Sequence, residues 1–314
     1  MKKNLIPSIV WQVILVCMVA IALAWVGARP AGGEKQTVVI PKGANRATIA
    51  KLLQEKRVIR SSFHFLVVTV LKPGVIQAGA YQLDPSQSVA QVVNTLHRGE
   101  NRFAVVTFPE GWRREQMAQR LTNEGYDGAG FLAATEGKEG YLFPDTYHFP
   151  LNATPAYIAS AMEANFWART DDITPTRDQV ILASVVERET KRDDQRAIVA
   201  GIFSNRLRIG MKLDADPTVQ YGRDTNLLNT GHPPEIYWQA ITLADYQNVI
   251  SPFNTYRRIG LPPTPIASPG RKSLEAAVRP ADTNALYFFH TSSGELITSR
   301  TLEEHNSNKQ KFLK

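Results

Sequence analysis

The fold and function that we infer for this chain depend most on the stretch Ile181-Leu-Ala-Ser-Val-Val-Glu-Arg-Glu-Thr190. It predicts an apolar helix with two carboxylates near its end. Upstream, Thr176-Arg-Asp-Gln179 has the spacing of a capping box, so we expect the helix to begin near Thr176. From Val180 to Val186 the only polar residue is Ser184, and a helix that is apolar all round is normally buried all round. The sequence therefore predicts a central buried helix.

Glu187 is the candidate catalytic residue of this helix. Helical spacing puts it on one stripe with Ala183 and Ser184, whereas Glu189 falls on a different stripe. A carboxyl group in an apolar pocket stays protonated near neutral pH and can act as a general acid. The alternative is an ordinary surface ion pair between Glu187 and Lys191 or Arg192.

Composition limits the classes of function. The 314 residues carry a net charge of +7, which suits an anionic membrane, a cell-wall polymer or nucleic acid. No zinc spacing, homeodomain-like helix or aromatic RNA-binding signature is visible, so we expect no nucleic-acid partner. Cys17 is the single cysteine, the histidines lack ligand spacing, and no Gly-rich phosphate loop occurs. We therefore expect neither a metal nor another cofactor.

The N-terminus predicts export. Lys2 and Lys3 precede an apolar run from Ile6 to Val26, which is long enough to span a bilayer once. The lysines place residues 1–5 in the cytoplasm and the rest of the chain outside it, with residues 6–28 as a retained anchor in the cytoplasmic (inner) membrane. The alternative is a signal peptide cleaved near Val26-Gly-Ala28.

Beyond a linker at 29–35, the pattern of residues 36–100 predicts a small module with the order strand, two helices, strand, helix. Val38-Val-Ile-Pro-Lys-Gly43 reappears 68 residues later as Val106-Thr-Phe-Pro-Glu-Gly111. Apolar residues follow each copy at matching positions. We interpret this echo as one strand-helix unit used twice.

The region 101–314 holds the Glu187 helix and several polar segments. Residues 195–207 predict an amphipathic helix, and residues 301–314 a polar closing helix. The stretch 213–222 predicts a loop or short strand, and Ser251-Pro-Phe-Asn-Thr-Tyr256 a rigid turn. Their side chains offer donors, acceptors and a stacking face suited to a sugar. The residues that we expect to bind substrate are Asp216, Thr218, Gln220, Tyr221, Asn254 and Tyr256.

These residues resemble a known family. The matching motifs include Glu139-Gly-Tyr-Leu-Phe-Pro-Asp-Thr-Tyr147, Ala183-Ser-Val-Val-Glu-Arg-Glu-Thr190, Asp216-Pro-Thr-Val-Gln-Tyr-Gly222 and Ser251-Pro-Phe-Asn-Thr-Tyr256. Their order is that of the membrane-anchored endolytic murein transglycosylases, the YceG-like or MltG family, over nearly the whole chain. Two departures are Phe253, where the family often has Tyr, and residues 294–298, which lack a usual Gly-x-His-x-Phe pattern.

The resemblance implies an α+β fold with an N-terminal transmembrane helix, a LysM-like module at 36–100 and a mixed catalytic region at 101–314. It implies an active-site helix like that of soluble lytic transglycosylases and lysozymes, and it places the catalytic glutamate at Glu187. The implied substrate is nascent peptidoglycan, cut internally so that strand growth ends beside membrane synthases, the penicillin-binding proteins.

The chemistry needs only one carboxyl group. Most glycosidases use two, but Asp216 and Glu189 have polar contexts that suit structural roles. In a lytic transglycosylase Glu187 protonates the leaving glycosidic oxygen, the substrate's N-acetyl group meets the cationic carbon, and the carboxylate then deprotonates the muramic C6 hydroxyl. The expected product has a 1,6-anhydro end. The alternatives are a hydrolase that uses water and a non-catalytic glycan-binding scaffold that recruits synthases.

Overall fold

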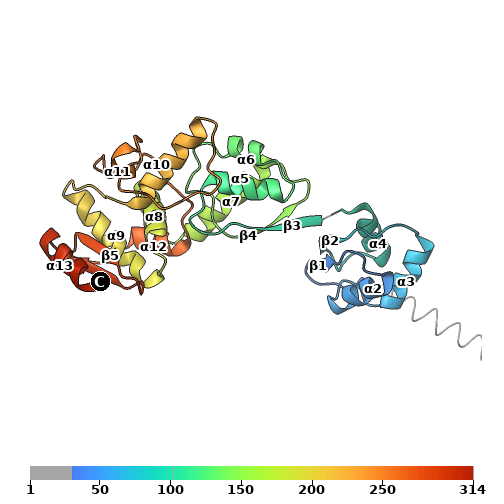
Figure 1. Cartoon of the computed structure of the whole chain (residues 1–314). Coiled ribbons are helices and arrows are strands. Elements are labelled where there is room, and N and C mark those ends of the chain that lie inside the picture. The colour runs from blue at the N-terminus through green and yellow to red at the C-terminus, as the bar shows by residue number, and fades with distance from the viewer. Residues whose placement is uncertain (1–29, 101, 314) are drawn as a thin grey trace, which may run out of the picture. The chain divides into compact units, whose positions relative to one another are not determined.

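The computed structural model describes residues 30–100 and 102–313, which form a mixed α+β chain (Figure 1). The predicted anchor at 6–28 lies outside these residues. Within the described ranges no helix is long and apolar enough to cross a bilayer. The described residues divide into two compact units, the first ending at Val105 and including His148–Asn152, the second formed by Val106–Tyr147 and the residues from Ala153 onward.

The first unit has a small core of its own. Val38, Tyr81 and Leu83 from the strands and Leu53 and Phe65 from the helices are fully buried in it. The strands β1 and β2 pair antiparallel. The elements are β1 (Gln36–Ile40), α2 (Arg46–Glu55), α3 (Ser62–Leu71), β2 (Gly79–Leu83), α4 (Val89–Arg98) and the start of β3 (Arg102–Thr107).

The strands β3 and β4 (Thr146–Pro150) carry the chain between the units, so residues 102–105 and 148–152 belong to the first unit. The predicted boundary lay at residue 100, and no pattern in the sequence indicated the return of 148–152 to the first unit. The sheet order is β1-β2-β3-β4. The second unit continues with α5 (Arg114–Asn123), α6 (Gly128–Ala134), α7 (Pro155–Thr170), α8 (Arg177–Glu189), α9 (Asp193–Arg208), α10 (Asp216–Asn229), α11 (Asp245–Asn248), α12 (Arg271–Val278), β5 (Tyr287–His290), β6 (Leu296–Ser299) and α13 (Leu302–Phe312).

The predicted repeat is confirmed. The bounds of α5 are those of α2 displaced by 68 residues, and both helices follow a strand and a Pro-x-Gly turn whose glycine has a positive φ. The buried residues also correspond, with Ile49, Ala50 and Leu53 in α2 matched by Met117, Ala118 and Leu121 in α5. The structure extends the echo, because β1-α2-α3-β2-α4 and β3-α5-α6-β4-α7 have the same element order.

The helix α8 is the centre of the second unit (Figure 1). Its N-cap is Thr176, with the reciprocal capping box to Gln179, and every residue from Val180 to Val186 is buried, so both predictions are confirmed. The helices α9, α10 and α12 pack against it.

The segment 263–270 follows α8 from its first turn to its last. Arg177 donates to the carbonyl of Pro263, Ser184 Oγ accepts from the N–H of Ile266 at 3.0 Å, and Gly270 reaches Glu187. Ser184, the one polar residue in the apolar run, therefore fixes this segment to the helix.

One local prediction was wrong. The stretch 216–222 is the start of α10 and not a loop or strand. Pro217 fits the first turn, where its missing N–H costs nothing, and Asp216 suits the positive end of the helix. At Gly222 the helix packs closely against Ser251, where an added Cβ would lie only 2.8 Å from the Ser251 side chain. This close packing accounts for a glycine within the helix.

We expect Ser184→Ala to lower the free energy of unfolding by about 1–3 kcal/mol, because the buried N–H of Ile266 loses its acceptor. Chemical denaturation measures the change. The matched control is Ser204→Ala, whose hydroxyl donates to Ala200 O and whose loss leaves no donor unpaired. Equal costs for the two variants would contradict this account.

Candidate active site

Glu187 lies in the last turn of α8 with only 6% of its side chain exposed. Its Oε1 is 2.8 Å from Nη1 of Arg196 on α9, which is equally buried. Its Oε2 accepts the N–H of Gly270 at 2.9 Å. Both carboxylate oxygens therefore have partners inside the second unit.

These partners differ from the apolar pocket that the sequence analysis expected around Glu187. The apolar residues of α8 precede Glu187 and pack in the core. The Glu187 carboxylate instead contacts the guanidinium of Arg196 and the backbone N–H of Gly270. Both contacts stabilise a negative charge. The alternative surface pair is also not formed, since Arg192 pairs with Asp194. Glu187 is held by a buried ion pair.

Arg196 organises the site. Its Nη1 donates to Ser273 Oγ at 2.6 Å, and its Nε lies 3.0 Å from Asp193 Oδ1. Its Nη2 lies 4.0 Å from Oε2 of Glu110. One buried cation thus faces three carboxylates from three segments of the chain.

The sequence analysis missed Glu110. It stands in the Pro-Glu-Gly turn after β3, and its side chain is 49% exposed. A Cβ on Gly270 would lie 1.8 Å from Glu110 Oε1, so this carboxyl packs against the same glycine whose N–H binds Glu187. Burial and the Glu187 carboxylate raise the pKa of Glu110. The 68-residue repeat was the one feature of the sequence that could have drawn attention to Glu110. The equivalent turn position in the first copy is occupied by Lys42, a residue of opposite charge.

The structure brings Asp216 and Tyr256 together. Tyr256 Oη donates to Asp216 Oδ1 at 2.6 Å, and the Tyr246 ring lies 4.2 Å from the Tyr256 ring. Glu189 faces this group, and burial followed by the Asp216 charge raises its pKa to about 8. These residues form a polar group separate in its contacts from Glu187.

Three other predicted substrate residues make internal contacts. Thr218 is fully buried and bonds to Ala215 O and Thr255 Oγ1. Asn254 is 0% exposed; it donates to the carbonyls of Tyr246 and Val249 and accepts the N–H of Tyr256. Gln220 donates to the carbonyls of Trp238 and Gln239.

Tyr221 belongs to a second buried charged cluster. The guanidinium of Arg113 lies 4.2 Å from its ring centroid, and its hydroxyl donates to Glu139 Oε2 at 3.5 Å. Glu139 Oε1 is buried without a hydrogen-bond partner among the described residues. Burial first, then the Glu115 charge, raise the pKa of Glu139 to about 8.

This cluster reaches the helix of Glu187 through an aromatic ring. The ring centroids of Trp238 and Tyr221 lie 6.1 Å apart. The guanidinium of Arg188 lies over the Trp238 ring, 4.1 Å from its centroid. Arg188 also donates to Gly111 O at 3.5 Å. In the described ranges no group of His, Cys, Asp and Glu has an arrangement that could hold a metal ion.

The sequence model of the YceG-like family matches residues 38–311. The chain belongs to that family. An endolytic murein transglycosylase of Bacillus subtilis (strain 168) is 29% identical over 90% of this chain and 87% of its own length. An endolytic murein transglycosylase of Streptococcus pneumoniae is 25% identical over 87% of this chain, which spans 57% of that relative.

A crystal structure of a YceG-like protein from Listeria monocytogenes matches with a TM-score of 0.56 and 28% sequence identity. The match covers 88% of this chain and all of that one. The α+β architecture of this YceG-like chain therefore has a counterpart among solved structures.

We expect Asn254→Ala to destabilise the protein by roughly 2–4 kcal/mol, because two carbonyls and one N–H lose buried partners. Thermal unfolding measures it. Asn226→Ala is the control, since Asn226 is exposed and its side chain donates one hydrogen bond, to Ile250 O at 3.1 Å. Lower turnover with an unchanged melting temperature would return Asn254 to the substrate-binding residues.

We expect stability to fall as the pH rises from about 4.5 to about 8, because the unfolded chain ionises Glu139 more readily than the folded chain does. Glu139→Gln should make this fall smaller by at least about 2–4 °C in melting temperature, which is worth ~1 kcal/mol in a domain of this size. Glu189→Gln should act in the same direction. An unchanged pH dependence in both variants would contradict the buried-acid interpretation.

Proposed function

We propose that this chain cleaves the glycan strands of peptidoglycan internally, as an endolytic murein transglycosylase with Glu187 as its acid and base. The relatives that bear this activity in their names support the substrate and the reaction class. The observation that carries the residue assignment is the clamp on Glu187, in which Arg196 and the N–H of Gly270 fix both carboxylate oxygens.

The clamp suits the second half of the reaction directly. Once Glu187 has given its proton to the leaving oxygen, its fixed carboxylate takes the proton of the muramic C6 hydroxyl, whose oxygen then attacks the anomeric carbon and closes the 1,6-anhydro ring. General base catalysis of this kind contributes roughly 10²- to 10⁴-fold. No water enters the product.

The first half needs a proton on Glu187, and Glu110 supports its supply. Two neighbouring carboxyl groups resist simultaneous ionisation, and the pKa of Glu110 is raised first by burial and then by the Glu187 charge. A proton shared by the pair passes from Glu187 to the leaving glycosidic oxygen. As that C–O bond breaks, the substrate's N-acetyl oxygen bonds to the anomeric carbon, and the C6 oxygen later displaces it. The C6 hydroxyl later returns one proton to Glu187, so the cycle closes without net uptake.

The cellular setting is part of the proposal. Residues 6–28 anchor the chain in the cytoplasmic membrane with residues 1–5 inside, and the LysM-like module at 36–100 binds glycan outside. Cleavage beside penicillin-binding proteins then ends the elongation of a strand. The apolar N-terminal run with its flanking lysines supports this arrangement.

We expect Glu187→Gln to lower the formation of anhydro ends on uncrosslinked glycan strands by at least about 10²-fold. Mass spectrometry identifies these ends, because they are lighter by one water than hydrolytic reducing ends. Asp178→Asn is the control in the exposed first turn of the same helix and should retain activity. Comparable melting temperatures for the variants would exclude unfolding as the cause.

Each alternative has its own outcome in this experiment. Activity that persists in Glu187→Gln would remove Glu187 from the mechanism. Reducing ends from the wild type would indicate a hydrolase, and no cleavage by the wild type would indicate a glycan-binding scaffold.

A further inference from the structure

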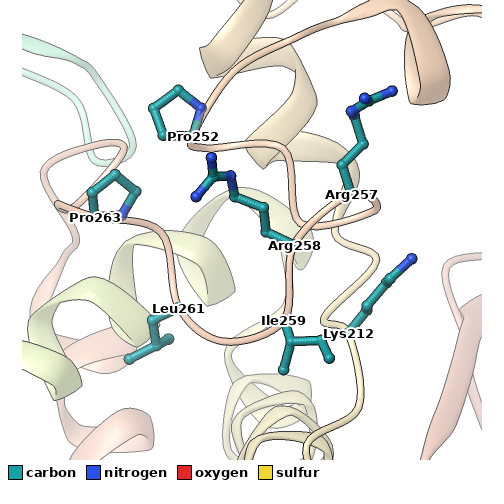
Figure 2. A pocket seen from close by; sticks show the side chains of 7 residues that line it. All are labelled: Lys212, Pro252, Arg257, Arg258, Ile259, Leu261 and Pro263. Atoms are coloured by element: carbon teal, nitrogen blue, oxygen red, sulfur yellow. The ribbon is translucent and has the colours of Figure 1, made fainter.

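A cavity of about 500 Å³ lies in the second unit and holds three basic side chains (Figure 2). Lys212, Arg257 and Arg258 line it together with Ile259, Leu261 and two prolines. A neighbouring cavity of about 400 Å³ also contains Arg257 and Arg258. The three cations come from the segment after α9 and from the loop that follows Tyr256.

The charge of this cavity is poorly neutralised by the protein. Arg257 donates a hydrogen bond to the carbonyl of Gln247, and the charge of Lys212 interacts with that of Asp214. In residues 30–100 and 102–313 no acidic side chain forms an ion pair with Arg257 or Arg258. Figure 2 shows Arg258 extended toward Pro252 and Pro263, and Arg257 on the opposite side.

Apart from the three basic side chains, the lining of the cavity is aliphatic and includes no aromatic ring. Ile259 is 65% exposed, and Leu261, Pro252 and Pro263 complete the lining. A sugar ring is usually held by an aromatic face and by carboxylate or amide groups, which this lining lacks. Arginine with aliphatic neighbours suits a ligand that carries carboxylates and small apolar side chains.

The cavity is within reach of the candidate active site. Pro263, one of its lining residues, accepts a hydrogen bond from Arg177 in the first turn of α8. Glu187 lies in the last turn of the same helix, about 15 Å along the axis at 1.5 Å per residue. An extended peptide covers ~3.3 Å per residue, so four or five residues span this distance.

We propose that this cavity binds the peptide stem of the peptidoglycan substrate, with Arg258 contacting a stem carboxylate. The proposal rests on the proposed function, because only a murein substrate brings such a peptide to the site. The glycan then occupies the Glu187 end of α8 while its peptide lies along the segment 258–263. The cavity thereby makes the enzyme prefer strands that still carry their peptides.

The test compares two substrates with the full-length enzyme in detergent. One is uncrosslinked glycan with its stem peptides, and the other is the same glycan after an amidase has removed them. Arg258→Gln should lower kcat/KM on the peptide-bearing strands about tenfold, mainly through KM, as expected for one lost charge-assisted hydrogen bond. It should leave cleavage of the peptide-free strands unchanged.

Two further variants sharpen the result. Arg258→Lys keeps the charge and should recover part of the loss. Arg300→Gln removes one exposed arginine outside the cavity and should affect neither substrate. An equal effect of Arg258→Gln on both substrates, or none on either, would overturn the proposal. An effect confined to strands that retain a lipid pyrophosphate would overturn it in favour of phosphate binding. Cleavage of peptide-free strands by the wild type would uphold the proposed function in each case.

Discussion

The buried ion pair between Glu187 and Arg196 constrains much of the second unit. A carboxylate and a guanidinium that are both removed from water must satisfy each other and their remaining polar atoms. Nη1 of Arg196 also donates to Ser273 and its Nε to Asp193, while Gly270 supplies the second partner of Glu187. The start of α12 and the first two turns of α9 are therefore tied to the last turn of α8.

The repeated strand-helix unit explains how a second carboxyl group enters this arrangement. Both copies use a Pro-x-Gly turn whose middle residue projects from the end of a strand. The first copy has Lys42 at this position and the second has Glu110. Gly270 has no side chain, and this lets Glu110 lie against the backbone that binds Glu187. In the second copy of the unit, one turn residue and one facing glycine thus bring a second carboxyl group to Arg196.

The sequence predicted what depends on local pattern. The capping box at Thr176, the buried run to Val186 and the 68-residue echo all follow from neighbouring residues. The start of α10 was missed because Pro217 and Gly222 weigh against a helix, whereas close packing on Ser251 favours one. Asn254 resembled a ligand contact because its type suits sugar binding; its burial depends on the carbonyls of Tyr246 and Val249, which only the folded loop brings near. Partners far apart in sequence, such as Arg196 and Glu110, leave no local signal.

The proposed role of Glu187 as acid and base makes two demands on its polar setting. An acid must hold a proton, and a base must be ready to receive one, while the partners of Glu187 are the Arg196 guanidinium and the N–H of Gly270. The neighbouring Glu110 serves the first demand, because its carboxyl group can hold a proton. It is half-exposed, it faces the same arginine, and its pKa is raised. A substrate that covers Glu110 would exclude water from both carboxyl groups and strengthen their repulsion. Under the proposed mechanism, binding of the glycan would then itself favour the retention of one proton by the pair, which is the state that the proposed first step requires.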